Sequence, residues 1–112
     1  MEYFITGIDT DIGKTFVTKG LALAFEDFEK KTGVFKPLQS GAIIKGNDRL
    51  APDLEEIKKY SKTVNTKCSY LLEGEVSPAL AARMANIKID VEKIKRDFSD
   101  FSRQNDITLV EG

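Results

Sequence analysis

The sequence predicts an α/β fold in which helices flank a parallel β-sheet. Short apolar segments at residues 3–8, 33–38 and 107–112 have the composition of buried strands, and longer segments with helical periodicity separate them. A glycine-containing turn joins the first strand to the first helix. Strands that alternate with helices usually form parallel sheets, because each helix crosses one face of the sheet before the next strand begins. We therefore expect a single α/β domain over residues 1–112.

The first strand leads into the segment Gly7-Ile-Asp-Thr-Asp-Ile-Gly13-Lys14-Thr15. Glycines let backbone N–H groups approach a polyphosphate, a lysine places positive charge on it, and a threonine hydroxyl can ligate Mg²⁺. The N-terminus of the following helix adds to this anion site. Five residues separate Gly7 from Gly13, one more than in the common phosphate-loop pattern, but the neighbouring strand and helix support the interpretation. The segment predicts a P-loop NTPase-like fold; the alternative is a glycine-rich turn without a ligand.

The first helix is expected from Lys14 to about Lys30, and Gly33 suits the end of a helix before the second strand at 33–38. Its helical pattern is indicated by apolar residues that fall near one face at 3.6-residue spacing, namely Val17, Leu21, Ala24 and Phe28.

The remaining segments are predicted from turn and capping signals. They are a long loop at 39–52, a helix at 53–60, a polar turn at 62–67, a short extended piece at 70–72, a helix that begins at Ser77-Pro78, a helix after Asp90 and the strand at 107–112. The buried face of the last helix is expected to consist of Val91, Ile94, Phe98 and Phe101. A parallel sheet normally has more than three strands, so the chain is expected to be the N-terminal part of a longer domain.

Composition excludes several classes of function. The formal net charge of −1 gives no basic field for nucleic acids or acidic membranes. The sequence has no histidine, which excludes histidine-based triads and histidine metal ligands. One cysteine, Cys68, cannot form an internal disulfide and is expected to be a packing residue. With neither a signal peptide nor an apolar run of membrane length, we expect a cytoplasmic protein that binds neither membranes nor nucleic acids.

Polar residues follow the second and third predicted strands at the edge where the phosphate loop lies. Lys36 closes the second strand and precedes Ser40, so Lys14 and Lys36 are two candidate cations for a transferring phosphoryl group. Asp53 and Glu111 could complete an oxygen-rich Mg²⁺ site with Thr15. Purely structural roles are the alternatives. Lys36 could be an edge lysine that discourages strand pairing, and Asp53 could be an acidic residue that the helix dipole favours in a first turn.

Taken together, these segments resemble dethiobiotin synthetase, an ATP-dependent enzyme family of biotin synthesis. The resemblance spans the chain and rests on G-I-D-T-D-I-G-K-T at 7–15, K-P-L-Q-S-G at 36–41, Asp53, S-P at 77–78 and L-V-E-G at 109–112. It implies that 7,8-diaminopelargonate takes up CO₂ as a carbamate, that ATP phosphorylates the carbamate to a mixed anhydride, and that the second amine closes the ureido ring. The additional residue in the phosphate loop is itself a feature of that family.

The resemblance also implies roles for single residues. Mg²⁺ would be held by Thr15, Asp53 and Glu111, and the carbamate and the moving phosphoryl group would face Lys14, Lys36 and Ser40. The ATP phosphates would be bound by Asp11, Ile12, Gly13, Lys14, Thr15 and Phe16. Family members form homodimers and continue well past V-E-G, so the isolated chain is expected to be unstable or to associate, and its own activity stays open.

Two other classes of function remain at this stage. One is a partitioning-type ATPase with a deviant Walker motif, in which nucleotide binding controls a dimer and no small molecule is carboxylated. The pair Lys36-Pro37 and Ser40-Gly41 has no clear role in such a protein, which favours the synthetase. The other is an inactive nucleotide-binding fragment that keeps phosphate affinity without a complete site.

Overall fold

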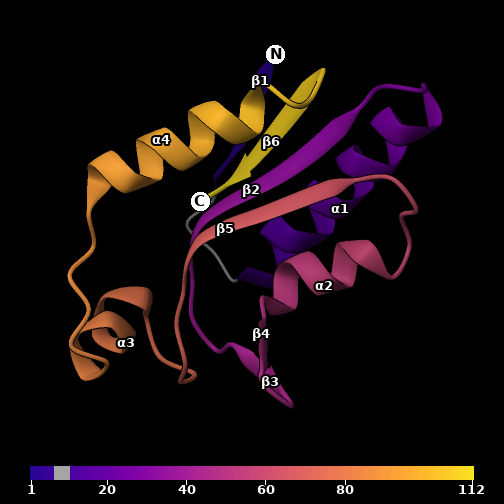
Figure 1. The fold of residues 1–112 in the computed structure, drawn as a ribbon. Coiled ribbons are helices and arrows are strands. Elements are labelled where there is room, and N and C mark those ends of the chain that lie inside the picture. The colour runs from indigo at the N-terminus through magenta and orange to yellow at the C-terminus, as the bar shows by residue number, and fades with distance from the viewer. Residues whose placement is uncertain (7–10) are drawn as a thin grey trace.

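The centre of the protein is a four-stranded parallel sheet in the order β1-β6-β2-β5 (Figure 1). The computed structural model describes residues 1–6 and 11–112, with Asp11 and Ile12 described by their backbone alone. The strands are β1 Glu2–Ile5, β6 Ile107–Glu111, β2 Thr32–Gln39 and β5 Asn65–Leu71. This arrangement confirms the predicted α/β class with a parallel sheet flanked by helices.

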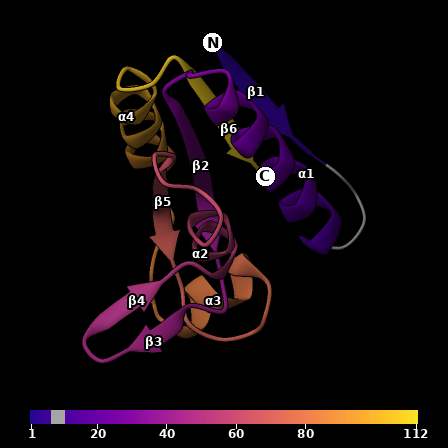
Figure 2. The same cartoon turned by 90° about the vertical axis from the view of Figure 1, so that its right-hand side faces the viewer.

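Helices cover both faces of this sheet, as Figures 1 and 2 show. Helices α1 (Asp11–Asp27) and α2 (Pro52–Lys58) lie on one face, and α4 (Val91–Ser102) lies on the other. Because side chains alternate along a strand, Val34 packs with the α1 and α2 core whereas its neighbour Phe35 packs with Phe101 of α4. The two cores are thus divided by β2 and by β6, all five residues of which are buried.

The capping signals were predicted correctly. Helix α3 (Pro78–Met84) begins after Ser77, whose hydroxyl accepts a hydrogen bond from the backbone N–H of Leu80 at 3.3 Å. Asp90 caps α4 in the same way, through the backbone N–H of Glu92 at 2.9 Å. Short polar side chains at these positions satisfy backbone donors that have no partner inside the helix.

The helix predicted after the phosphate loop is confirmed, but its apolar face at helical spacing is not the face that meets the sheet. The helix runs from Asp11 to Asp27, and the residues that face the sheet are Thr18, Ala22 and the half-buried Phe25. The four residues of the apolar face are exposed, namely Val17, Leu21, Ala24 and Phe28. The helix has apolar residues on two faces, so periodicity alone does not show which face meets the sheet. Gly33 also lies within β2 and does not end the helix.

The segment at 39–52, predicted as a long loop, contains an antiparallel hairpin. Its strands are β3 (Ile43–Lys45) and β4 (Asp48–Leu50), and Gly46 in the turn has a φ of 64°. Gly46 and Asn47 are residue types that adopt this left-handed conformation at low cost. The Gly-Asn pair between two short β-compatible segments was the signal that the loop prediction missed.

The strand β5 begins inside the predicted polar turn at 62–67 and includes residues 70 and 71 of the predicted extended piece, so the extended piece is confirmed in part and the turn is shorter than predicted. It pairs with β2 from Gly33–Asn65 to Gln39–Leu71 and forms one edge of the sheet. The apolar pattern did not identify β5 because its sequence is polar, and a strand at an edge need not be apolar on both faces. Cys68 of β5 packs against the core on the α1 side, and burial raises the pKa of its thiol to about 11. The prediction of a packing cysteine is therefore confirmed.

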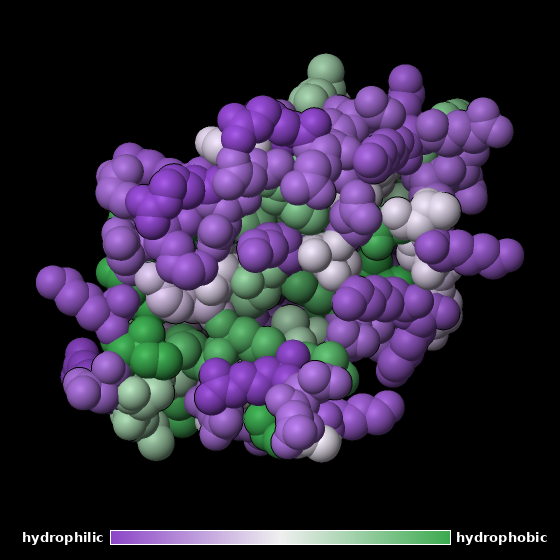
Figure 3. Space-filling model, in the orientation of Figure 1, coloured by the Kyte–Doolittle hydropathy of each residue, from purple (hydrophilic) through white to green (hydrophobic). Residues whose placement is uncertain are grey.

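Several hydrophobic side chains remain at the surface. Figure 3 shows hydrophobic residues gathered over the region of α3, where Leu80 and Met84 are exposed. Val91, predicted to be buried, is 58% exposed, whereas Phe101 of the same helix is buried as predicted. Among the helices that the structure describes, none is long and apolar enough to cross a membrane.

Candidate functional site

The carboxyl ends of the central strands bring together residues from four segments of the chain. Glu111 ends β6, which lies between β1 and β2, and it pairs in register with Ile5 at the end of β1. The hydroxyl of Thr15, in the first turns of α1, donates a 2.9 Å hydrogen bond to Oε1 of Glu111. Lys14 Nζ donates to the backbone carbonyl of Gly112, also at 2.9 Å. The start of α1 and the end of β6 therefore meet, as predicted.

Lys36 projects from β2 into the same region. Its Nζ donates a 2.7 Å hydrogen bond to Oδ2 of Asp53 and lies 3.8 Å from Oε2 of Glu111. Asp53 reaches this position from the first turn of α2, which begins at Pro52. The side chain of Lys36 is only 6% exposed. The alternative of a solvated edge lysine is therefore wrong, because β2 is an internal strand and Lys36 is buried.

Glu111 is a fully buried carboxylate. Burial raises its pKa above the ordinary value, against the opposing effects of the Lys36 charge and the hydrogen bond from Thr15. One of its oxygens, Oε1, accepts from Thr15, while Oε2 has no hydrogen-bond partner within the described structure. Because buried polar atoms are normally hydrogen-bonded, this oxygen calls for an explanation such as an ion.

A pocket of about 310 Å³ opens beside these residues. Its lining includes Lys14, Lys36, Ser40, Pro78 and Glu111. Both predicted cations and the predicted hydroxyl therefore face one cavity. The size is at the lower end for a small-molecule site.

The lining also includes residues that the sequence analysis did not assign to the site. Pro78 reaches the pocket from α3; it was predicted as the first residue of a helix and belongs to the S-P motif of the resemblance, but it was not assigned to the site. Gln39 lines the pocket next to Ser40, and its Oε1 is buried without a partner in the described structure. Ser77 itself acts as a helix cap.

The remaining predicted phosphate-binding residues lie around the start of α1. Gly13 is exposed, and a Cβ placed on it would have no atom within 4 Å, which leaves its backbone open to approach. Phe16 is 71% exposed and does not line the pocket. Asp11 and Ile12 fall in α1, but their side chains are outside the described part of the structure, as are residues 7–10.

The donor atoms at this site suit a hard divalent cation. Thr15, Asp53 and Glu111 offer a hydroxyl and two carboxylates, and Mg²⁺ binds oxygen ligands with few carboxylates plus phosphates and waters. In the described part of the chain, no group of three or more His, Cys, Asp or Glu residues gathers as a metal cage. The geometry thus fits an ion that is held jointly by protein and phosphate.

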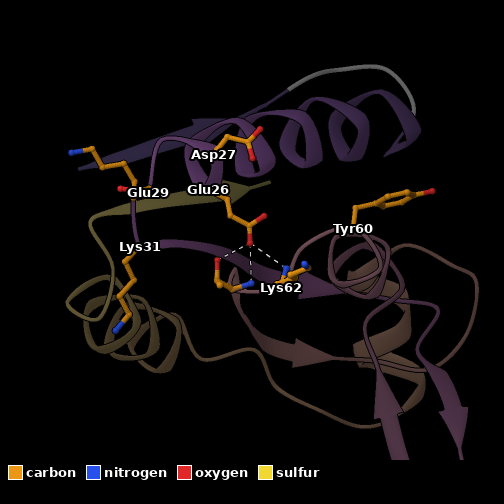
Figure 4. Close-up of a pocket in the computed structure, with 8 residues that line it drawn as sticks. Glu26, Asp27, Glu29, Lys31, Tyr60 and Lys62 are labelled. Carbon is orange, nitrogen blue, oxygen red and sulfur yellow. Dashed lines mark hydrogen bonds between the residues drawn. The ribbon is translucent and has the colours of Figure 1, made fainter.

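A larger cavity, of about 660 Å³, lies at the opposite end of β2 (Figure 4). One of the acidic residues that line it is Glu26. A single carboxylate oxygen of Glu26 accepts hydrogen bonds from the Ser61 hydroxyl, the Lys62 backbone N–H, and the backbone N–H and hydroxyl of Thr63. These bonds lower the pKa of Glu26 to about 2. They join the end of α1 to the segment after α2, so this charge has a structural role.

Comparison with known proteins agrees with this geometry. A family model described as an AAA domain matches residues 1–112. The chain belongs to the AAA domain family. It is 35% identical to the ATP-dependent dethiobiotin synthetase BioD of Fusobacterium nucleatum, over 99% of this chain and 51% of that protein. It is 37% identical to the protein of the same name from Anoxybacillus flavithermus, over 98% of this chain and 50% of the relative.

These matches confirm the resemblance that the motifs indicated. A third relative of the same name, from Clostridium botulinum, is 37% identical over 97% of this chain and 49% of its own length. The AAA domain described here thus spans about half the length of the curated relatives that it matches. The prediction that residues 1–112 are part of a longer domain stays a prediction.

Proposed function

We propose that this protein is an ATP- and Mg²⁺-dependent dethiobiotin synthetase. The observation that carries the proposal is the meeting of Lys36, Asp53 and Glu111 with the Thr15 hydroxyl at the carboxyl edge of the sheet. Relatives named dethiobiotin synthetase, each matched over nearly the whole of this chain, support the choice of this reaction over other ATP-dependent ones.

In this proposal, the nucleotide binds at the beginning of α1. Residues 11–16 hold the phosphates through backbone N–H groups and the charge of Lys14, aided by the positive end of the helix dipole. Thr15, Asp53 and Glu111 hold Mg²⁺, which neutralises phosphate charge when it is bound. Oε2 of Glu111 lies 3.8 Å from Lys36 Nζ but has no hydrogen bond in the described structure, which supports this assignment because an ion could coordinate that oxygen.

The proposed substrates are 7,8-diaminopelargonate and CO₂, which form a carbamate on one amine. A carbamate oxygen attacks the γ-phosphorus of ATP; the bond to the β-phosphate oxygen breaks, and ADP leaves. The second amine then attacks the carbamate carbon, loses a proton and expels phosphate as the ring closes. Lys14, Lys36 and Ser40 line the pocket where this group would lie, and two ammonium groups suit the charge that spreads over a transferring phosphoryl group.

The setting of the enzyme belongs to the same proposal. We place it in the cytoplasm, as a homodimer that acts on small molecules and binds neither nucleic acid nor membrane. The absence of a strong net charge supports the choice of small-molecule partners.

Titration of Mg-ATP into the chain tests the nucleotide site. We expect Lys14→Ala to weaken binding by about tenfold or more, because a charge-assisted contact to phosphate is lost. Lys19→Ala is the matched control: this lysine lies in the same helix but pairs with Glu56 on α2, so its removal should leave Mg-ATP binding unchanged. Equal binding by the wild type and Lys14→Ala would contradict the proposed phosphate site.

A second measurement separates the synthetase from the alternatives. ATP turnover that rises on addition of 7,8-diaminopelargonate and bicarbonate, with dethiobiotin detected by mass spectrometry, would support the proposed reaction. Turnover without the diamine would favour a partitioning-type ATPase. Binding of Mg-ATP without turnover under either condition would identify a nucleotide-binding fragment that is inactive by itself.

A further inference from the structure

The ammonium group of Lys36 lies between the two carboxylates that the proposed function assigns to the metal. It is 2.7 Å from Oδ2 of Asp53 and 3.8 Å from Oε2 of Glu111. Lys36 is 6% exposed, Asp53 is 18% exposed and Glu111 is fully buried, so water contributes little to this cluster. Contact with the substrate alone would not explain why Lys36 is positioned next to both carboxylates.

Burial explains why a cation must be present there. A buried carboxylate without a counter-charge is strongly unfavourable, and removal of one partner of a buried pair leaves the other charge uncompensated. Lys14, the other cation at the site, donates to the carbonyl of Gly112, and its charge also acts to lower the pKa of Glu111. Lys36 lies within ion-pair distance of both Asp53 and Glu111.

The space beside Asp53 and Glu111 cannot hold the Lys36 ammonium and a metal ion at the same time. An ion held by Oδ2 of Asp53 and Oε2 of Glu111 would lie about 2 Å from each oxygen, and these are the two oxygens that the Lys36 ammonium approaches. Such an ion and the ammonium would therefore compete for the same space. Two positive charges so close together in a buried site repel strongly. The ammonium group can move to a second position, because Lys36 also lines the 310 Å³ pocket with Ser40 and its four-carbon side chain can rotate.

We propose that Lys36 is the resident counter-ion of the metal site and that a divalent cation displaces its ammonium group into the substrate pocket. Lys36 then meets the negatively charged reacting group only after the metal is in place. This coupling gives an order to binding, since the pocket gains its second cation as a consequence of metal entry. The inference rests on the metal ligands named under the proposed function.

Chemical labelling of lysines in the wild-type chain tests the displacement directly. In a brief acetylation followed by peptide mass spectrometry, Lys36 should react slowly without metal, because its ammonium is buried and paired. Millimolar Mg²⁺ or Mn²⁺ should raise its labelling rate by about tenfold as the ammonium enters the open pocket. Lys19 is the internal reference and should react at the same rate in both conditions. An unchanged or slower labelling of Lys36 with metal would overturn the proposal.

Metal affinity provides the second test. Free Mn²⁺ is measured by electron paramagnetic resonance in the absence of nucleotide, for the wild type, Lys36→Met and Lys19→Met. Lys36→Met should bind Mn²⁺ about tenfold more tightly than the wild type, because the ion no longer has to break an existing pair. Lys19→Met removes the same charge from the part-buried pair with Glu56, away from the proposed metal ligands, and should not alter the affinity. Affinity in Lys36→Met equal to or weaker than that of the wild type would also overturn the proposal.

The outcomes separate this inference from the proposed function. If Lys36→Met does not fold, the wild-type labelling experiment decides alone. If Mg-ATP binds in a Lys14-dependent manner while Lys36 labelling does not respond to metal, only the displacement fails. If neither metal nor Mg-ATP binds to the wild type, the displacement and the proposed nucleotide site fail together.

Discussion

At the scale of single residues, Glu26 shows how one carboxylate connects two segments. Its Oε1 accepts four hydrogen bonds from Ser61, Lys62 and Thr63, which are 35 to 37 positions away in the sequence. These bonds are stronger to the ionised form and lower the pKa of Glu26 from 4.5 to about 2. In the unfolded chain the carboxylate has no such partners.

The low pKa makes stability depend on pH in a defined direction. A group whose pKa is lower in the folded state stabilises the protein above its unfolded pKa, and this contribution is lost as the pH falls towards the folded pKa. We therefore expect the free energy of unfolding to decrease between about pH 4.5 and about pH 2. Glu26→Gln should decrease less over this range, and should cost about 1 kcal/mol at pH 7 through weaker hydrogen bonds.

Urea unfolding followed by circular dichroism at several pH values measures this effect. Glu29→Gln is the matched control, because Glu29 lines the same cavity and the substitution is chemically identical. An equal pH dependence in the wild type and Glu26→Gln would show that Glu26 does not contribute.

The sequence predicted the convergence of the site residues but not their pairing. Strand ends in a parallel sheet share an edge, so Lys36 and Glu111 were expected to be neighbours of Thr15, and they are. The ion pair between Lys36 and Asp53 depends on how α2 returns to the sheet after the hairpin, and no local pattern contains that information. For the same reason Gln39 and Pro78 were missed as lining residues.

At the scale of elements, β2 and α4 approach so closely that only glycine fits at position 33. A Cβ added to Gly33 would lie 2.7 Å from ring atoms of Phe101 and would also overlap the side chain of Asn105. We expect Gly33→Ala to destabilise the protein by about 1 to 3 kcal/mol, because a packed core must shift to accept it.

Gly20 provides the opposite case. It is exposed in the middle of α1, and a Cβ there would meet no atom within 4 Å. Gly20→Ala should stabilise the chain by about 0.5 to 1 kcal/mol, because alanine loses less backbone entropy in a helix. Thermal unfolding of both variants beside the wild type tests the pair; a stabilised Gly33→Ala would refute the close approach of β2 and α4.

The elements that the sequence predicted well are those with a local signal. Ser77-Pro78 and Asp90 mark helix starts through hydrogen bonds within a few residues, so they were identified correctly. The strand β5 is held by its pairing with β2, and its sequence Asn65-Thr-Lys-Cys-Ser-Tyr-Leu71 shows little apolar alternation. Helical periodicity identified α1 but not the face that packs on the sheet, because Val17, Leu21 and Phe28 share an apolar face and yet are exposed.

At the scale of the whole molecule, hydrophobic side chains stay exposed at one edge of the sheet and just after α1. Strand β1 is an edge strand whose Phe4 is 67% exposed, and Phe28, which follows α1, is 76% exposed. Exposed apolar patches next to an unpaired strand edge favour association. We therefore expect the 112-residue chain to associate as its concentration rises.

Sedimentation velocity over a range of concentrations tests this expectation. The double variant Leu21→Lys and Phe28→Lys should reduce association, because it places charges on the exposed face of α1 without touching the sheet contacts of Thr18 and Ala22. A wild-type chain that stays monomeric at every concentration and melts cooperatively would contradict the prediction.

The bond between Thr15 and Glu111 joins residues 96 positions apart, and that between Lys14 and Gly112 joins residues 98 apart. Residues 14–15 must therefore meet residues 111–112 before the pocket exists. A ligand that recognises this junction binds only the native chain, so it raises the melting temperature in proportion to the logarithm of its concentration. The ligand-dependent rise in melting temperature, measured by calorimetry, thus reports formation of this junction without any assay of turnover.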